Sequence, residues 1–172
     1  MIDVCVICAR KGSKEVKNKN LINFFGKSLI TWSIEQAINS KLFHKVYVST
    51  DSKKIADISR KSGAEVPFLR SSQLSNDQAS KFLVWKNALN KIEKITKKKI
   101  RYYVDLDCTN PIRTKKDIEG VINLLKENKK ADGVVTVCKA KKNPYFNIVE
   151  KSKTNILKIS KKIKKKVLLR QQ

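Results

Sequence analysis

The chain begins with an apolar run, Ile2 to Ala9, that stops abruptly at a basic loop. A continuous run of β-branched and small apolar residues is typical of a buried strand in the centre of a parallel sheet. The carboxyl ends of such strands are where α/β proteins bind their ligands. The loop at this end, Arg10 to Asn20, contains four Lys, one Arg, a Gly and a Ser. Cationic side chains and backbone N–H groups at one concave place predict a polyphosphate site.

Segments with helical spacing and short β-rich runs alternate along the chain. Ser28 is a candidate N-cap for a helix whose apolar positions run from Leu29 to Ile38, and Gly63 is a candidate stop for the next helix. Further helices are expected at Ser52 to Ser62, about Gln78 to Ile95 and Thr114 to Asn128, and further strands at Lys45 to Ser49, Glu65 to Phe68, Ile100 to Leu106 and Gly133 to Cys138. This alternation over 172 residues predicts one α/β sandwich domain with a mostly parallel sheet.

The last part of the chain has a different pattern. Two short apolar runs, Phe146 to Val149 and Ile156 to Ile159, flank a polar turn and predict a small β-hairpin. The lysine-rich run that follows, Lys161 to Lys166, is typical of a solvated loop.

The charge of the chain permits several partners. Its formal net charge is +24, from 39 Lys and Arg against 15 Asp and Glu, which would attract nucleotides, nucleic acid or anionic membranes. The lysines are scattered over every expected helix, which favours a solvated surface over a nucleic-acid interface. Apolar residues recur with helical spacing at Phe82, Trp85, Ala88, Leu89 and Ile92. We interpret them as the core-facing side of a helix and not as an aromatic platform for nucleic-acid bases.

The four cysteines lie in or beside apolar, strand-like runs. Cys5 and Cys8 have the spacing of a metal knuckle, but residues three apart in one strand point to opposite faces. We therefore expect Cys5, Cys8, Cys108 and Cys138 to be reduced core thiols of a cytoplasmic protein. No apolar run approaches the roughly twenty residues of a membrane span, no secretory signal is expected, and His44 is expected at the surface.

The basic loop lacks the spacing of the P-loop and of the dinucleotide-binding Gly-x-Gly-x-x-Gly motif. It contains instead Ala9-Arg10, then Ser13-Lys14, and further on Lys19-Asn20. This pattern resembles the signature of the acylneuraminate cytidylyltransferases, also called CMP-sialic acid synthetases. Glu15 and Lys17 stand where that family has Gly and Pro.

Further blocks of the family follow in the same order. Val48 to Asp51 looks like its second strand and turn, and Arg70 with Leu74 to Ser80 resembles its Arg-Pro-x-x-Leu-x-x-Asp-x-Ala-Ser block. Asp107 to Arg113 is similar to its Gln-Pro-Thr-Ser-Pro-Leu-Arg segment, and Arg170 to Gln172 looks like its Arg-Gln block. The resemblance spans essentially the whole chain and implies a Rossmann-like three-layer sandwich of the nucleotide-diphospho-sugar transferase type.

The resemblance implies that a nonulosonate, a 2-keto sugar acid, attacks the α-phosphate of CTP and releases pyrophosphate, with Mg²⁺ as cofactor. CTP and the sugar acid are the implied partners, a homodimer the implied assembly, and lipopolysaccharide or other cell-surface glycan synthesis the implied setting. The family's motif makes Lys19 and Arg10 catalytic. It assigns nucleotide binding to Arg10, Gly12, Ser13, Lys19, Asn20, Arg70, Asp77 and Ser80, and sugar binding to Asp107, Thr109 and Asn110.

Three aspartates have competing interpretations. Asp51 and Asp77 each precede an expected helix, so N-capping is the default role for both. Asp107 stands where the family has Gln, and a carboxylate at the end of a central strand suits either a Mg²⁺ or sugar ligand or a hydrogen-bonded structural residue.

Several functional alternatives stay open. One is transfer of CMP to an eight-carbon keto-sugar acid, although the Arg70 and Asp77 block favours the nine-carbon branch. The others are a nucleotide-binding domain without activity and a basic nucleic-acid-binding domain. Residues 1–172 are expected to form a single cytidylyltransferase-like domain that lacks the C-terminal part of the family.

Overall fold

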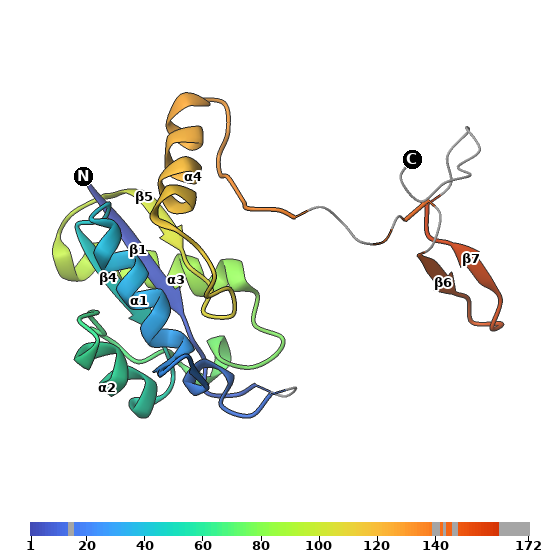
Figure 1. Cartoon of the computed structure of the whole chain (residues 1–172), viewed down its shortest axis with the longest axis horizontal. Coiled ribbons are helices and arrows are strands. Elements are labelled where there is room, and N and C mark those ends of the chain that lie inside the picture. The colour runs from blue at the N-terminus through green and yellow to red at the C-terminus, as the bar shows by residue number, and fades with distance from the viewer. Residues whose placement is uncertain (14–15, 139–141, 143, 146–147, 162–172) are drawn as a thin grey trace. The chain divides into compact units, whose positions relative to one another are not determined.

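The computed structural model describes residues 1–13, 16–138, 142, 144–145 and 148–161 (Figure 1). The chain divides into two compact units, Met1–Asp132 and Gly133–Gln172, and each is described by itself. The single domain expected over residues 1–172 stays a prediction.

A three-stranded parallel sheet lies at the centre of the first unit. Its strands are β1 (Ile2–Cys8), β4 (Lys45–Ser49) and β5 (Ile100–Asp105), in the order β4-β1-β5. In the register, Val6 lies beside Tyr47 on one side and Asp105 on the other. The expected central position of the first strand is therefore confirmed, and its apolar run is explained by burial on both faces.

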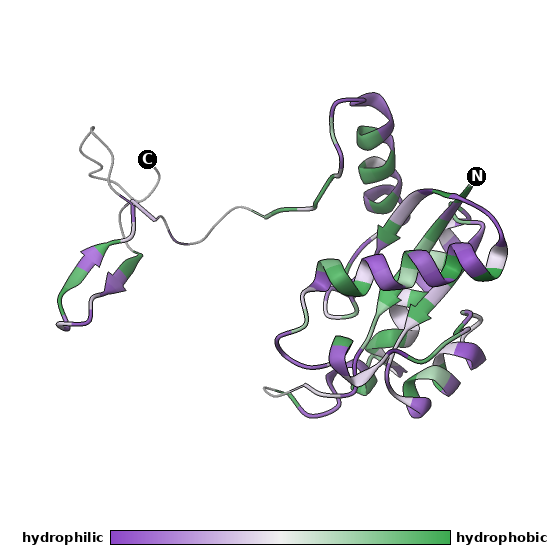
Figure 2. Cartoon of the chain, turned by 180° about the vertical axis from the view of Figure 1, so that it is seen from behind, coloured by the Kyte–Doolittle hydropathy of each residue, from purple (hydrophilic) through white to green (hydrophobic). Residues whose placement is uncertain are grey.

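Helices cover both faces of this sheet (Figure 1). Residues from α1 (Leu29–Ser40), α2 (Lys53–Lys61) and α4 (Lys115–Glu127) form a core cluster with Cys5 and Ile7 of β1 and with Ala9, which follows the strand. On the opposite face, α3 (Lys81–Thr96) contributes Ala88 and Ile92 to a second cluster with Val4 and Val6. In Figure 2 the strands of this sheet are mainly hydrophobic, whereas the helices carry hydrophilic outer faces. The three-layer α/β sandwich is thus confirmed.

Local sequence signals set several helix boundaries. Ser28 and Ser52 are the N-caps of α1 and α2, and the side chain of each accepts a backbone N–H of the first turn. Thr114 and Asp117 form a capping box at the start of α4. Gly63, with φ of 91°, follows α2 in a conformation that suits glycine.

Short elements connect these parts. They are the 3-10 helices η1 (Lys19–Leu21) and η2 (Ser72–Leu74) and the antiparallel pair β2 (Asn23–Phe24) and β3 (Lys27–Ser28). The strand expected at Glu65 to Phe68 is present only as isolated bridges, Tyr47 to Glu65 and Thr50 to Leu69, beside β4.

The core stripe predicted for α3 is only partly correct. Ala88 and Ile92 are fully buried, but the side chain of Phe82 is 66% exposed. The third buried position is Val84, which lies about 200° around the helix from Phe82. The orientation of α3 on the sheet therefore places Val84 against the core and Phe82 in solvent.

The second unit contains the expected β-hairpin with shifted bounds. Its strands are β6 (Val149–Lys151) and β7 (Leu157–Ile159), paired antiparallel. Phe146 and residues 162–166, for which a strand start and a solvated loop were predicted, lie outside the described residues. The strand predicted at Gly133 to Cys138 is wrong for the described chain: Val135 and Val137 are 79% and 88% exposed, because no strand pairs with this run there.

The cysteine prediction is correct for two residues. Cys5 and Cys108 are buried free thiols, and burial raises the pKa of Cys108 to about 12. Cys8 is half-buried, and Cys138 is exposed because its expected strand does not form. His44 is exposed, as expected.

Candidate active site

The candidate site lies where the carboxyl ends of the three strands meet. The backbone N–H of Ala9 donates to the Ser49 carbonyl at 3.0 Å, and that of Arg70 donates to the Thr50 carbonyl at 2.8 Å. The segments that leave β1 and β4 are therefore hydrogen-bonded to their neighbours just beyond the sheet. The predicted polyphosphate loop starts at this edge.

Arg10 joins two distant parts of the predicted nucleotide site. Its carbonyl accepts a hydrogen bond from Asn20 Nδ2 at 3.0 Å, and Asn20 itself is buried. Its guanidinium Nη2 lies 2.7 Å from Asp77 Oδ1. Asp77 is therefore an ion-pair partner of Arg10 and not the expected N-cap, because Ser80 occupies the N-cap position of α3.

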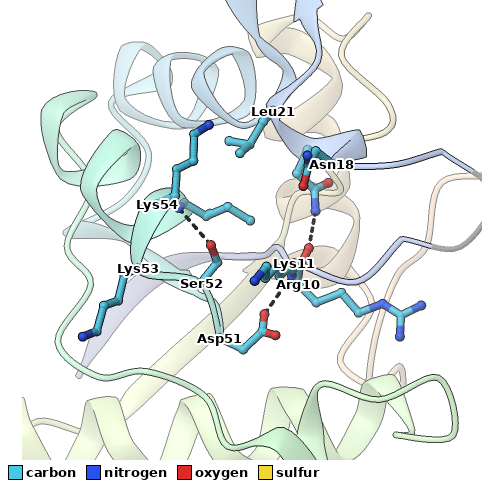
Figure 3. A pocket seen from close by; sticks show the side chains of 10 residues that line it. Arg10, Lys11, Asn18, Leu21, Asp51, Ser52, Lys53 and Lys54 are labelled. Atoms are coloured by element: carbon cyan, nitrogen blue, oxygen red, sulfur yellow. Dashed lines mark hydrogen bonds between the residues drawn. The ribbon is translucent and has the colours of Figure 1, made fainter.

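Asp51 also holds the loop instead of capping a helix. Its Oδ1 accepts the backbone N–H of Lys11 at 2.8 Å, while Ser52 caps α2 (Figure 3). The N-capping role expected for Asp51 is wrong for this reason. Together with Asn20, Asp51 fixes the first residues of the basic loop against the sheet.

A cavity of about 440 Å³ opens beside this loop (Figure 3). Its lining includes the predicted residues Arg10 and Asn20, and three further cations, Lys11, Lys53 and Lys54. Sequence reasoning missed Lys53 and Lys54, although both begin α2, and helix N-termini favour anions. The cavity is suited to an anion with several charges.

Arg70 is buried, with only 7% of its surface exposed. Its Nε donates to Ser75 Oγ at 3.1 Å. Burial lowers the pKa of this guanidinium, and the nearby Cys8 and Asp51 oppose the shift. Arginine nevertheless stays protonated in proteins, so Arg70 places a fixed positive charge beside the ends of β1 and β4.

The other predicted nucleotide ligands lie on the loops around this edge, outside the cavity lining. Lys19 and Ser13 are half-buried, whereas Gly12 and Ser80 are exposed. Lys19 begins η1, directly after Asn18, whose φ is 55°. Their contacts with a nucleotide stay predictions.

Charged residues also gather at the end of β5. Lys81 Nζ lies 2.6 Å from Asp105 Oδ2 and 3.5 Å from Asp107 Oδ2. Burial lowers the pKa of Lys81, but the contacts with Asp105 outweigh it, so the net pKa is raised. Desolvation raises the pKa of Asp105 in spite of this ion pair. Asp105 was not identified from the sequence, and Lys81, a departure from the small polar residue of many relatives, was not assigned to the site.

Asp107 is held by its own loop. Its Oδ1 accepts both the backbone N–H and the hydroxyl of Thr109, at 2.9 and 2.7 Å. Burial would raise the pKa of Asp107, but these bonds and the charge of Lys81 lower it. Arg113 donates to the carbonyls of Asp107 and Asn110, so the predicted sugar-binding loop is ordered around two side chains, those of Asp107 and Arg113.

Comparisons with known proteins agree with this arrangement. A family model described as "Cytidylyltransferase" matches residues 4–172. A CMP-N,N'-diacetyllegionaminic acid synthase of Campylobacter jejuni and the post-translational flagellin modification protein B of Campylobacter coli are each 41% identical over 155 residues, 90% of this chain and 66% of the relative. The chain thus spans about two thirds of the length of these curated relatives.

The fold is shared with solved structures. A CMP-2-keto-3-deoxy-manno-octonic acid synthetase complexed with CTP matches with a TM-score of 0.59 and 23% identity, over 74% of this chain and 48% of that one. None of the helices in the described part of the chain combines the length and apolar character needed to cross a bilayer.

Proposed function

Because this chain belongs to the cytidylyltransferase family, we propose that it transfers CMP from CTP to a nine-carbon 2-keto sugar acid and releases pyrophosphate. The observation that carries this proposal is the cavity of about 440 Å³ beside β1, whose lining contains four cations, Arg10, Lys11, Lys53 and Lys54, and one carboxylate, Asp51. A triphosphate with several negative charges is the type of ligand that such a lining favours.

In the proposed step, the anomeric hydroxyl oxygen of the acceptor forms a bond with the α-phosphorus of CTP. The bond from that phosphorus to the oxygen bridging to the β-phosphorus breaks, pyrophosphate leaves with the bonding electrons, and the hydroxyl proton passes to solvent. Negative charge increases on the phosphate oxygens during this step, so cations already in place stabilise the transition state. We assign this role to Arg10 and Lys19, with Gly12 and Ser13 binding the phosphates.

The two substrates occupy neighbouring parts of the strand edge in this proposal. Asn20, Arg70 and Ser80 bind the nucleotide. Asp77, also a predicted nucleotide ligand, holds Arg10 in an ion pair in the free chain, and the triphosphate takes its place on Arg10. The acceptor lies beyond β5, against the loop that contains the remaining predicted ligands. These ligands are Asp107, Thr109 and Asn110.

The expected Mg²⁺ does not fit the described residues as a protein-built site. Among them, no group of three His, Cys, Asp or Glu side chains is placed to hold a metal ion. Asp107, the predicted ligand, has one oxygen bonded to Thr109 and the other facing Lys81. The requirement for Mg²⁺ stays a prediction.

The relatives suggest which acceptors to test. One of the two relatives that match over 90% of this chain is named for a legionaminic acid derivative. A pseudaminic acid cytidylyltransferase of Campylobacter jejuni is 46% identical over 89 residues. An N-acylneuraminate cytidylyltransferase of Escherichia coli is 33% identical over 145 residues. We therefore propose a legionaminic-type acceptor first. A cytoplasmic location, a homodimer and a role in cell-surface glycan synthesis complete the proposal.

The test is a pyrophosphate-release assay with CTP, a Mg²⁺ series and a panel of acids: N,N'-diacetyllegionaminic, pseudaminic, N-acetylneuraminic and the eight-carbon keto-deoxy-octonic acid. Release that requires CTP and one of the nine-carbon acids supports the proposal. Release only with the eight-carbon acid supports the alternative acceptor. No release, together with duplex DNA binding that weakens steeply with salt, would support a nucleic-acid-binding domain instead.

A loop variant tests the assigned chemistry. We expect Lys19→Ala to abolish pyrophosphate release and to leave the circular dichroism spectrum unchanged, since Lys19 is half-buried at the surface of the fold. Lys17→Ala is the matched control, because Lys17 is an exposed lysine of the same loop. Turnover of Lys19→Ala equal to that of the control would remove Lys19 from the mechanism.

A further inference from the structure

The ammonium group of Lys81 is positioned by contacts on three sides. It lies 2.6 Å from Asp105 Oδ2, 3.5 Å from Asp107 Oδ2 and 5.4 Å from the centre of the Trp85 ring. Lys81 is the first residue of α3, and Trp85 lies one turn further along the helix. These contacts hold the ammonium group of Lys81 in one place, whereas the ammonium group of a solvated surface lysine is free to move.

Asp105 depends on this lysine. Its side chain is only 13% exposed, and its Oδ1 is buried and makes no hydrogen bond with any described residue. The indole Nε1 of Trp85 is likewise buried, and its N–H is near enough to Asp105 to lower the pKa of that carboxyl. A carboxylate this far from water needs a cation beside it, and Lys81 is the cation that contacts it.

The cluster lies at the edge where the acceptor has to arrive. Asp105 ends β5 and is paired in register with Val6 of β1, the strand that continues into Arg10. An acceptor whose hydroxyl reaches the α-phosphate beside Arg10 therefore passes the end of β5. There it meets two carboxylates, Asp105 and Asp107, while carrying a carboxylate of its own.

We propose that Lys81 determines acceptance of acidic sugars, because it holds both carboxylates in ion pairs and offers a remaining N–H donor to the acceptor carboxylate. The inference rests on the proposed function. With Lys81 the cluster of three side chains has a net charge of −1, since one cation offsets part of two anions. Without it the charge is −2 as long as both carboxyl groups are ionised, and an anionic acceptor is repelled.

The experiment compares Lys81→Met, which keeps the aliphatic stem, with Lys81→Arg and with Lys86→Met, an exposed lysine of the same helix. Turnover gives separate KM values for CTP and for the acceptor acid. Calorimetry of the acceptor acids, with a non-hydrolysable CTP analogue bound, gives affinities independently of turnover.

For Lys81→Met we expect the KM and Kd for the acceptor to rise about tenfold or more and the KM for CTP to stay within about twofold. Lys81→Arg should recover most of the loss, and Lys86→Met should match the wild type.

A double variant separates charge from structure. Lys81→Met combined with Asp105→Asn restores the net charge of −1, so we expect it to bind the acceptor more tightly than Lys81→Met alone. A merely structural role for Lys81 instead raises the KM for CTP together with that for the acceptor in Lys81→Met, and the double variant then lowers both. The inference is overturned if the wild type binds the acceptor and Lys81→Met binds it equally well, or if the KM for CTP rises in parallel. A wild-type chain that neither binds nor turns over any acid overturns the proposed function together with the inference.

Discussion

The proposed mechanism assigns the guanidinium of Arg10 to the phosphates of CTP, but in the free chain this group is ion-paired with Asp77. Arg10 Nη2 and Asp77 Oδ1 are 2.7 Å apart, and the side chains are 34% and 39% exposed. Pairs with this exposure are screened by water and stabilise a protein by about 0.2 to 1 kcal/mol. Because the triphosphate competes with Asp77 for Arg10, Asp77→Asn should lower the Kd for CTP by up to about fivefold.

Calorimetric titration with CTP at low and at physiological salt checks this prediction. Asp57→Asn is the control, because Asp57 pairs with Arg60 on the exposed face of α2. We expect the control to leave the Kd unchanged and the advantage of Asp77→Asn to shrink as salt screens the charges. A Kd for Asp77→Asn that is tenfold higher than that of the wild type would refute the reasoning. It would indicate that Asp77 holds Arg10 in its productive position or contacts the nucleotide directly.

Three further predictions concern the fold. Ile92→Ala should reduce the free energy of unfolding by about 2 to 5 kcal/mol in urea, because Ile92 is fully buried, whereas Phe82→Ala should change it by less than about 0.5 kcal/mol. Hydrogen bonds from the Arg101 guanidinium hold the pKa of Asp3 below its ordinary value, so their contribution is present above about pH 4 and is lost as pH falls through the lower folded-state pKa. Asp3→Asn should therefore flatten the acid limb of a stability curve from urea denaturation at several pH values. Ellman's reagent should modify Cys138 rapidly in the native chain and all four thiols after denaturation, since Cys138 is exposed.

The locally encoded features of the fold could be predicted from the sequence. The apolar run of β1 indicated a buried central strand, and Ser28 and Gly63 marked helix boundaries. These signals depend on residues a few positions apart, through hydrogen bonds of the first turn or through periodic burial. For the same reason the basic loop could be assigned to the carboxyl end of a strand before any tertiary contact was known.

Predictions that required knowledge of neighbouring elements failed. The apolar run at Gly133 to Cys138 forms no strand among the described residues, because a strand needs a partner and the pattern does not supply one. Phe82 is exposed because the phase of α3 on the sheet selects Val84 instead. Asp51 and Asp77 do not cap helices, because both bind the loop after β1. Asp51 accepts the backbone N–H of Lys11, and Asp77 pairs with the guanidinium of Arg10.

The sequence by itself determined the fold class, the central strand and the position of a basic loop at its carboxyl end, since each follows from local periodicity and composition. Only the tertiary structure decided which charges meet: Arg10 with Asp77, Lys81 with Asp105. It also placed Lys53 and Lys54 at the cavity beside the loop. Ion pairs between separate elements depend on strand register and helix phase, which are set by the packing of the whole core and cannot be found in any single segment.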